Sequence, residues 1–197
     1  MDVKRTIKID TKRFITNDII EFDLKTGERI EAMAVKQTNE GMIFVSVNCL
    51  AKEYQMFKNA EILSSDKLTY ENSSLRLLLN NEILNCFPDK IKTHMLPINE
   101  YGDLLRIPTE CEIFGENING IPDTKEQWVC MNELRNRIAF SGDGKAREWY
   151  WLMNRCKRDS ETTDFNDYFT VVEEYGHSLF LPAAGPGGVR LVFLMKN

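Results

Sequence analysis

The last fifty residues, 148–197, restrict the fold of this chain more than any other segment. They open with the run Glu-Trp-Tyr-Trp-Leu-Met (148–153) and close with Pro-Gly-Gly-Val-Arg-Leu-Val-Phe-Leu-Met (186–195). Both runs are short, rich in aromatic or β-branched residues, and bounded by polar residues, Gly or Pro. This is the pattern of buried strands.

A hairpin is predicted between these two runs. Residues 169–173 and 179–181 have strand character, and the break between them contains Gly176. A short break centred on Gly joins antiparallel strands. The C-terminal part of the chain therefore predicts an antiparallel sheet, from which a long polar loop at residues 154–167 extends.

The final strand, residues 189–195, needs hydrogen-bonding neighbours on both sides, because its apolar composition predicts burial. We expect the strand at 148–153 or the strand at 169–173 on one side, and an early meander, residues 18–47, on the other. This pairing would bring the two ends of the chain together.

Strand geometry also predicts how the aromatic run divides. Successive side chains of a strand point to opposite faces. Trp149 and Trp151 should therefore share one buried face and help to fill the main core, with Tyr150 and Leu152 on the other face.

The first part of the chain predicts a meander. Strands at 18–24, 29–36 and 42–47 alternate in polarity and are separated by turns that contain Gly. Residues 1–17 are either an edge strand or a loosely ordered arm.

Two main helices are predicted to cover these sheets. The first spans 72–85, where Asn and Ser side chains precede a Leu stripe and can cap it. The second spans 123–138, where Asp123 with Glu126 fits a capping box and apolar residues recur at helical spacing. The order of elements predicts a single α+β domain over 18–197, with antiparallel sheets built from both chain ends.

Composition excludes several classes of protein. A net charge of −5 without a dense Lys/Arg run argues against a nucleic-acid partner. No apolar run is long enough to cross a bilayer, and the N-terminus lacks a signal-peptide core, so we expect a cytoplasmic protein or a component of a phage virion. The five cysteines are scattered without C-x-x-C spacing, which predicts free thiols. With two histidines and no phosphate-loop motif, we expect no metal and no cofactor.

Four features carry a family resemblance. The first is the early meander at 18–47. Residues 68–85 are similar to a segment of the form W/Y-E-x-S-x-L-R-x-W-L-N-x-E-F-x-N, the Trp149 strand to W-W-L-R-S, and residues 187–193 to G-V-R-P-A, with Leu191 in place of the Pro. Together they resemble an uncharacterised bacterial and phage domain family. Met153 and Asn154 stand where that family has Arg and Ser.

The resemblance implies a fold akin to C-type lectin-like domains and to the formylglycine-generating-enzyme branch of that fold. Some bacterial and phage relatives of the fold display ligand-binding loops. Formylglycine-generating enzymes use a pair of late cysteines, and this chain has only Cys156 in its last third. The Glu-Pro-Asn and Trp-Asn-Asp runs of calcium lectins do not occur in it.

We therefore expect a non-enzymatic module that binds a glycan or protein through its C-terminal loops. Aromatic and polar side chains on loops over a rigid sheet suit recognition. The candidate ligand-binding residues are Arg155, Asp164, Tyr168, Tyr175 and His177. Two alternatives are a structural component of a phage particle and an enzyme of the formylglycine-generating type.

Overall fold

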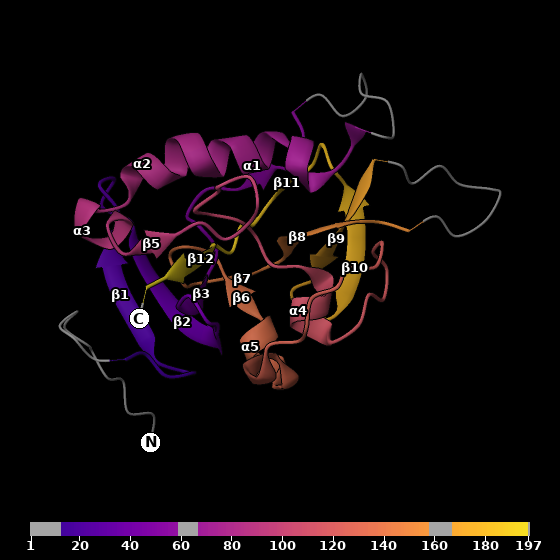
Figure 1. Ribbon diagram of the computed structural model, residues 1–197. Helices are drawn as coiled ribbons and strands as arrows, with labels where there is room; N and C mark the ends of the chain where they lie inside the picture. Colours follow the sequence, from indigo (N-terminus) through magenta and orange to yellow (C-terminus); the bar gives the residue numbers. More distant parts are fainter. Residues whose placement is uncertain (1–12, 59–66, 158–166, 197) are drawn as a thin grey trace, which may run out of the picture.

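The computed structural model describes residues 13–58, 67–157 and 167–196, which form one mixed α/β domain with antiparallel sheets (Figure 1). The largest sheet has five strands in the order β1-β2-β3-β12-β5. These strands are β1 (Ile19–Asp23), β2 (Arg29–Gln37), β3 (Met42–Ser46), β5 (Met95–Leu96) and β12 (Val192–Met195). The first three form the predicted meander, in which Ile20, Phe22 and Ile30 face the core. The predicted meander is therefore confirmed, and residues 1–12 lie outside the described part.

The last strand, β12, lies inside this sheet, with β3 on one side and β5 on the other. The predicted neighbour from the meander is confirmed. The prediction that the strand at 148–153 or at 169–173 would be the second neighbour is wrong, because both belong to another sheet. β5 takes that place because the segment that follows the first helix runs antiparallel beside β12. Next to this pair, Lys196 N donates to the carbonyl of His94 at 2.8 Å.

The two ends of the described chain meet in one aromatic cluster. The Phe14 ring packs edge-on against Phe44, with 5.0 Å between centroids. Phe44 in turn stacks on Phe193 of β12 at 5.6 Å. Segments from both ends of the described chain thus lie side by side in one sheet, as predicted.

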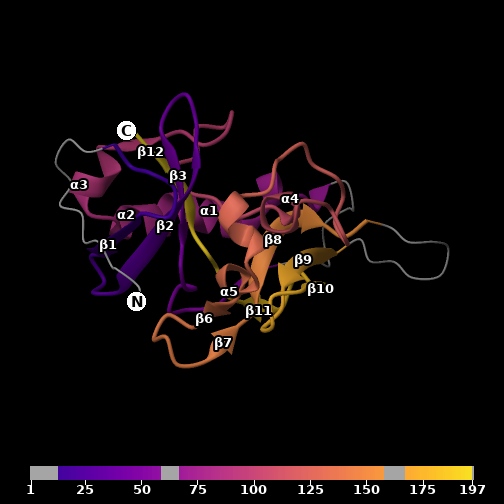
Figure 2. The same ribbon diagram turned by 90° about the horizontal axis from the view of Figure 1, so that it is seen from below.

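A second sheet lies beside the first, and Figure 2 shows the two on opposite sides of the molecule. Its three strands, in the order β10-β9-β8, are β8 (Tyr150–Arg155), β9 (Tyr168–Val172) and β10 (Ser178–Pro182). β9 and β10 form the predicted hairpin, and Gly176 in its turn has a φ of 86°, which a Gly adopts without strain. Two short pairs complete the sheets: β4 (Tyr54–Gln55) with β11 (Pro186–Gly187), and β6 (Ala139–Phe140) with β7 (Arg147–Glu148).

β8 separates two hydrophobic cores. Trp151 is fully buried in the larger core, and Trp149 packs against it with ring centroids 5.0 Å apart. Tyr150 and Leu152 are fully buried in the smaller core on the opposite face. The predicted division of the aromatic run between two faces is confirmed.

The first predicted helix is confirmed and covers one face of the five-stranded sheet (Figure 1). It runs without interruption through α1 (Ser74–Leu78), a π-helical turn η4 (Leu79–Ile83) and α2 (Leu84–Cys86). The Ser73 hydroxyl accepts a hydrogen bond from Arg76 N at 3.0 Å and so caps its first turn. A single turn, α3 (Asp89–Lys92), follows it.

The prediction of a second helix at 123–138 is wrong. Residues 123–128 are not helical, and the rest divides into a 3-10 turn η5 (Val129–Asn132) and one α-helical turn α5 (Leu134–Arg137). Glu133 between them is extended, with φ −85° and ψ 121°. Trp128 and Met131 are buried, but Leu134 is 47% exposed. Separate turns thus bury these apolar side chains one or two at a time, so their burial does not require a continuous helix.

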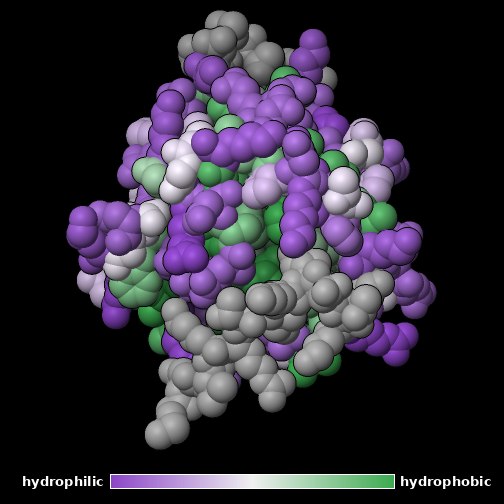
Figure 3. All heavy atoms as spheres, turned by 90° about the vertical axis from the view of Figure 1, so that its left-hand side faces the viewer, coloured by the Kyte–Doolittle hydropathy of each residue, from purple (hydrophilic) through white to green (hydrophobic). Residues whose placement is uncertain are grey.

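The outer edge of the five-stranded sheet is β1, on the side that faces the viewer in Figure 3. Hydrophobic side chains gather near the centre of that face, and hydrophilic side chains surround them. On β1 itself, Glu21 and Asp23 each lie 3.6 Å from the guanidinium of Arg29. Charges of this kind discourage edge-to-edge pairing with another chain. None of the described helices is long and apolar enough to span a membrane.

Candidate functional site

Arg155 and Tyr168 lie at the same end of the three-stranded sheet, Arg155 at the end of β8 and Tyr168 at the start of β9. The prediction of a loop that begins at residue 154 is wrong in that bound, because Asn154 and Arg155 still lie in the sheet as part of β8. Arg155 closes β8 and stands opposite Phe169, while Cys156 N donates to the carbonyl of Tyr168 at 2.8 Å. The Tyr168 ring packs edge-on against Phe180 of β10 at 6.0 Å. Asp164 lies outside the described residues.

Tyr175 and His177 lie at the other end of the same sheet, in the turn between β9 and β10. Because Tyr168 begins β9 and Val172 ends it, about 13 Å of strand separates the two ends at roughly 3.3 Å per residue. Tyr175 is 60% exposed, and the guanidinium of Arg147 lies 5.5 Å from its ring centre. The structure therefore brings Arg155 and Tyr168 together and places Tyr175 and His177 apart from them.

The base of the predicted loop is the point where the chain leaves β8. It is fixed by Asn154, a buried residue of this strand. Its Oδ1 accepts from Glu110 N at 2.7 Å, and its Nδ2 donates to the carbonyl of Ile121 at 3.0 Å and to Asp123 Oδ2 at 2.8 Å. The Thr170 hydroxyl donates to the Asn154 carbonyl at 3.0 Å. One amide side chain therefore ties β8 to the first turn of α4 (Glu110–Phe114) and to the segment at 117–123.

A buried carboxylate reinforces this base. Glu110 has no exposed surface, and its carboxylate accepts from Asn119 N at 3.1 Å, from Gly120 N at 2.7 Å and from the Ser178 hydroxyl. Burying a carboxylate is costly unless donors replace its water. Three donors from two segments do so here, which holds the 117–123 segment against β10.

A hollow of about 240 Å³ opens beside Arg155. Its lining residues come from η3 (Tyr70–Asn72) and the residue before it, from the segment at 117–123, and from the end of β8. They are Thr69, Tyr70, Glu71, Ile121, Met153, Asn154 and Arg155. Desolvation raises the pKa of the fully buried Tyr70, so its phenol stays protonated at neutral pH. The lining thus combines a guanidinium, a carboxylate, a hydroxyl and apolar surface.

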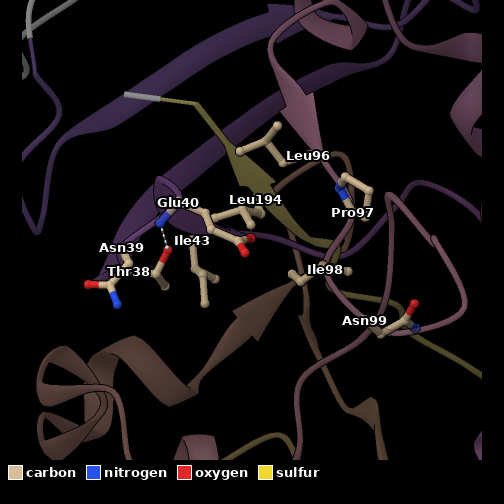
Figure 4. Close-up of a pocket in the computed structure, with 9 residues that line it drawn as sticks. All are labelled: Thr38, Asn39, Glu40, Ile43, Leu96, Pro97, Ile98, Asn99 and Leu194. Atoms are coloured by element: carbon tan, nitrogen blue, oxygen red, sulfur yellow. Dashed lines mark hydrogen bonds between the residues drawn. The ribbon is translucent and has the colours of Figure 1, made fainter.

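A larger hollow of about 880 Å³ lies on the five-stranded sheet (Figure 4). Ile43, Leu96, Ile98 and Leu194 form its apolar floor, and the turn between β2 and β3 forms one side of its rim. The sequence predictions missed this hollow because β5 is a two-residue strand without a pattern of its own. Its floor comes from three distant segments that only the sheet brings together.

The polar residues that carry the family resemblance are structural ties. The Arg76 guanidinium makes a paired contact with Asp103 at 2.6 and 3.0 Å, and Asn80 Oδ1 accepts from the backbone N of Leu104 and Leu105. Arg190, which is 1% exposed, donates to backbone carbonyls and to the Tyr150 hydroxyl. These residues hold the helix and the last strands in place, and they are not available to a ligand.

None of the five cysteines forms a disulfide bond, and four of them are buried. Among the described residues, no group of three or more His, Cys, Asp or Glu side chains could hold a metal ion. Comparison of the chain with protein-family models, with curated proteins and with solved structures found no match. The functional inferences therefore depend on the chain's own geometry.

Proposed function

We propose that this protein is a non-enzymatic binding module with a C-type lectin-like fold, and that it recognises a glycan at the Arg155 end of its three-stranded sheet. The fold proposal is supported by a five-stranded sheet to which both ends of the chain contribute strands and by a second, smaller antiparallel sheet beside it. It is also supported by the motif residues at 68–85 and 187–193, several of which tie these parts together.

The observation that carries the binding proposal is the pairing of opposite chemistry in the Arg155 hollow. A guanidinium only donates hydrogen bonds, whereas an ionised carboxylate only accepts them. Arg155 and Glu71 line the same hollow. Each hydroxyl of a sugar both donates and accepts, so neighbouring hydroxyls can form hydrogen bonds with a guanidinium and with a carboxylate at once. The apolar sides of Met153 and Ile121 can pack against the C–H face of the same ring.

Size and rigidity agree with a small ligand group. A volume of about 240 Å³ is below the roughly 300–1,000 Å³ of sites for drug-sized molecules. It suits one sugar residue of a longer glycan. Because Asn154 is fixed by the buried ties to Glu110 and Asp123, the floor is preorganised, which lowers the entropic cost of binding.

A glycan array tests this proposal. Wild type should give signals that Arg155→Ala and Glu71→Gln each abolish or strongly reduce. The matched controls are Tyr175→Ala and His177→Ala at the other end of the sheet, which should leave the signals unchanged. Equal loss in all four variants, or no loss in the first two, would place recognition elsewhere.

The loop itself is tested separately. Residues 158–166 are replaced by a Gly/Ser linker of equal length, and the buried residues Asn154 and Cys156 are kept because they belong to the sheet. Loss of glycan signal with an unchanged melting temperature would assign contacts to the loop. A wild type that binds no glycan or surface protein and forms a stable oligomer would refute the proposal in favour of a structural role in a particle.

A further inference from the structure

The larger hollow on the five-stranded sheet has rigid sides. On one side, the Thr38 hydroxyl accepts from Glu40 N at 3.2 Å and from Gly41 N at 3.1 Å, which fixes the turn between β2 and β3. Gly41 lies so close to the carbonyl of Met195 that a Cβ at this position would overlap it. The turn is therefore clamped against β12.

The opposite side is equally fixed. Asn99 Nδ2 donates to Asp103 Oδ2 at 2.7 Å, while its Oδ1 accepts from the backbone N of Tyr101 and of Asp103 at 3.1 Å. Asp103 is itself held by Arg76. With both sides held, the hollow is a preformed site and does not have to be opened by a ligand.

The lining residues define which ligand can enter. Figure 4 shows nine of them: four aliphatic residues at the floor, Pro97, three neutral polar residues, and Glu40. None is aromatic and none is basic. The Glu40 carboxylate reaches over Ile43 and Leu194 toward the centre of the hollow (Figure 4).

Glu40 is the one charged residue among those that line the hollow. Lys36 stands opposite Ile43 in the β2–β3 ladder, but its ammonium already pairs with Glu126 at 2.9 Å. Among the described residues, no cation lies within ion-pair distance of Glu40. Lys196 follows β12 and passes close to Gly41, so its charge is the one that could oppose Glu40.

From these features we infer that the hollow binds a small molecule with an aliphatic chain and a terminal ammonium group. The chain packs on the Ile43, Leu96 and Leu194 floor, and the ammonium donates to the Glu40 carboxylate. A protonated alkyl amine keeps its charge at neutral pH, since an alkyl ammonium such as that of lysine has a pKa of about 10.4. This site is separate from the glycan site proposed at Arg155, and it lies on the other sheet.

The test compares three probes of equal chain length: n-hexylammonium, hexanoate and n-hexanol. Binding is followed by amide chemical shifts in ¹H–¹⁵N NMR spectra, which also report where each probe binds. Hexylammonium should shift the amides of Gly41, Ile43 and Leu194 and bind at least about threefold more tightly than hexanoate, the scale expected for a solvent-exposed charge. Glu40→Gln should remove this preference and retain the binding of hexanol.

Two further variants separate the contributions. Leu96→Ser removes part of the floor and should weaken all three probes together, whereas Lys196→Gln should leave the preference for hexylammonium intact or increase it. Unchanged amide spectra away from the substituted residue show that each variant is folded. The inference is refuted if hexanoate or hexanol binds as tightly as hexylammonium, or if the shifted amides lie outside the hollow.

Discussion

Replacement of Trp151 by Ala should be among the most destabilising single changes in this chain. The side chain has no exposed surface, lies in the larger core and packs edge-on against Trp149. Truncation of a buried Trp to Ala costs about 3–5 kcal/mol. The indole N–H also donates to the carbonyl of the partly buried Tyr54 at 2.8 Å, and removing this donor adds up to about 1–3 kcal/mol. The upper end of the first range is therefore expected.

Two companion variants divide this cost. Trp151→Phe keeps most of the buried ring and loses the bond to Tyr54, so it should cost about 1–3 kcal/mol. Trp149→Ala removes a side chain that is only half-buried and should cost less than Trp151→Ala, about 2 kcal/mol.

The measurement is the free energy of unfolding from urea denaturation followed by far-UV circular dichroism. A domain of this size has about 5–15 kcal/mol of stability, so Trp151→Ala could leave the chain unfolded; the two milder variants then carry the comparison. A cost below about 1 kcal/mol for Trp151→Ala, or a larger cost for Trp149→Ala than for Trp151→Ala, would refute the placement of Trp151 in the interior and of Trp149 at a half-buried position.

Three other outcomes are expected. Asn154→Ala should lower the free energy of unfolding by about 1–3 kcal/mol, because it leaves the buried N–H of Glu110 without an acceptor and removes the donor to the Ile121 carbonyl and to Asp123; Ala at the exposed Asn132 should have little effect in the same urea denaturation. Burial and the nearby Glu53 raise the pKa of Glu148, so its ionisation opposes folding, and this penalty is absent at low pH and appears as pH rises above the usual carboxyl range. Glu148→Gln should therefore raise the melting temperature at pH 7 and leave it unchanged near pH 3; the same gain at both values would contradict the pKa assignment. In the folded protein Cys86 should react first with a thiol reagent, because among the five cysteines it alone is partly exposed, and denaturation should bring the count to all five; three or fewer would mean that disulfides form.

Local patterns determined much of the architecture. The meander and the hairpin of β9 and β10 were predictable because alternation with a period of two and a Gly-containing turn are both encoded by neighbouring residues. The first helix was predictable for the same reason, since Ser73 provides its cap and the Leu stripe its buried face. The division of Trp149 and Trp151 from Tyr150 follows from strand geometry alone.

Tertiary contacts decided the rest. The spacing of Trp128 and Met131 fits a helix, but these side chains are buried by separate short turns, and local spacing does not distinguish the two solutions. β5 could not be predicted because a two-residue strand is stabilised only by its neighbour β12.

The same limit applies to the sites. Tyr175 and His177 are close in sequence to Tyr168, yet an extended strand carries them to the opposite end of the sheet. The Arg155 hollow joins residues near 70, 121 and 154, and the larger hollow joins residues near 40, 97 and 194. Side chains so far apart in the chain carry no shared local signal. Their proximity is set by sheet order and by buried ties such as Asn154 to Glu110, which exist only when the whole chain has folded.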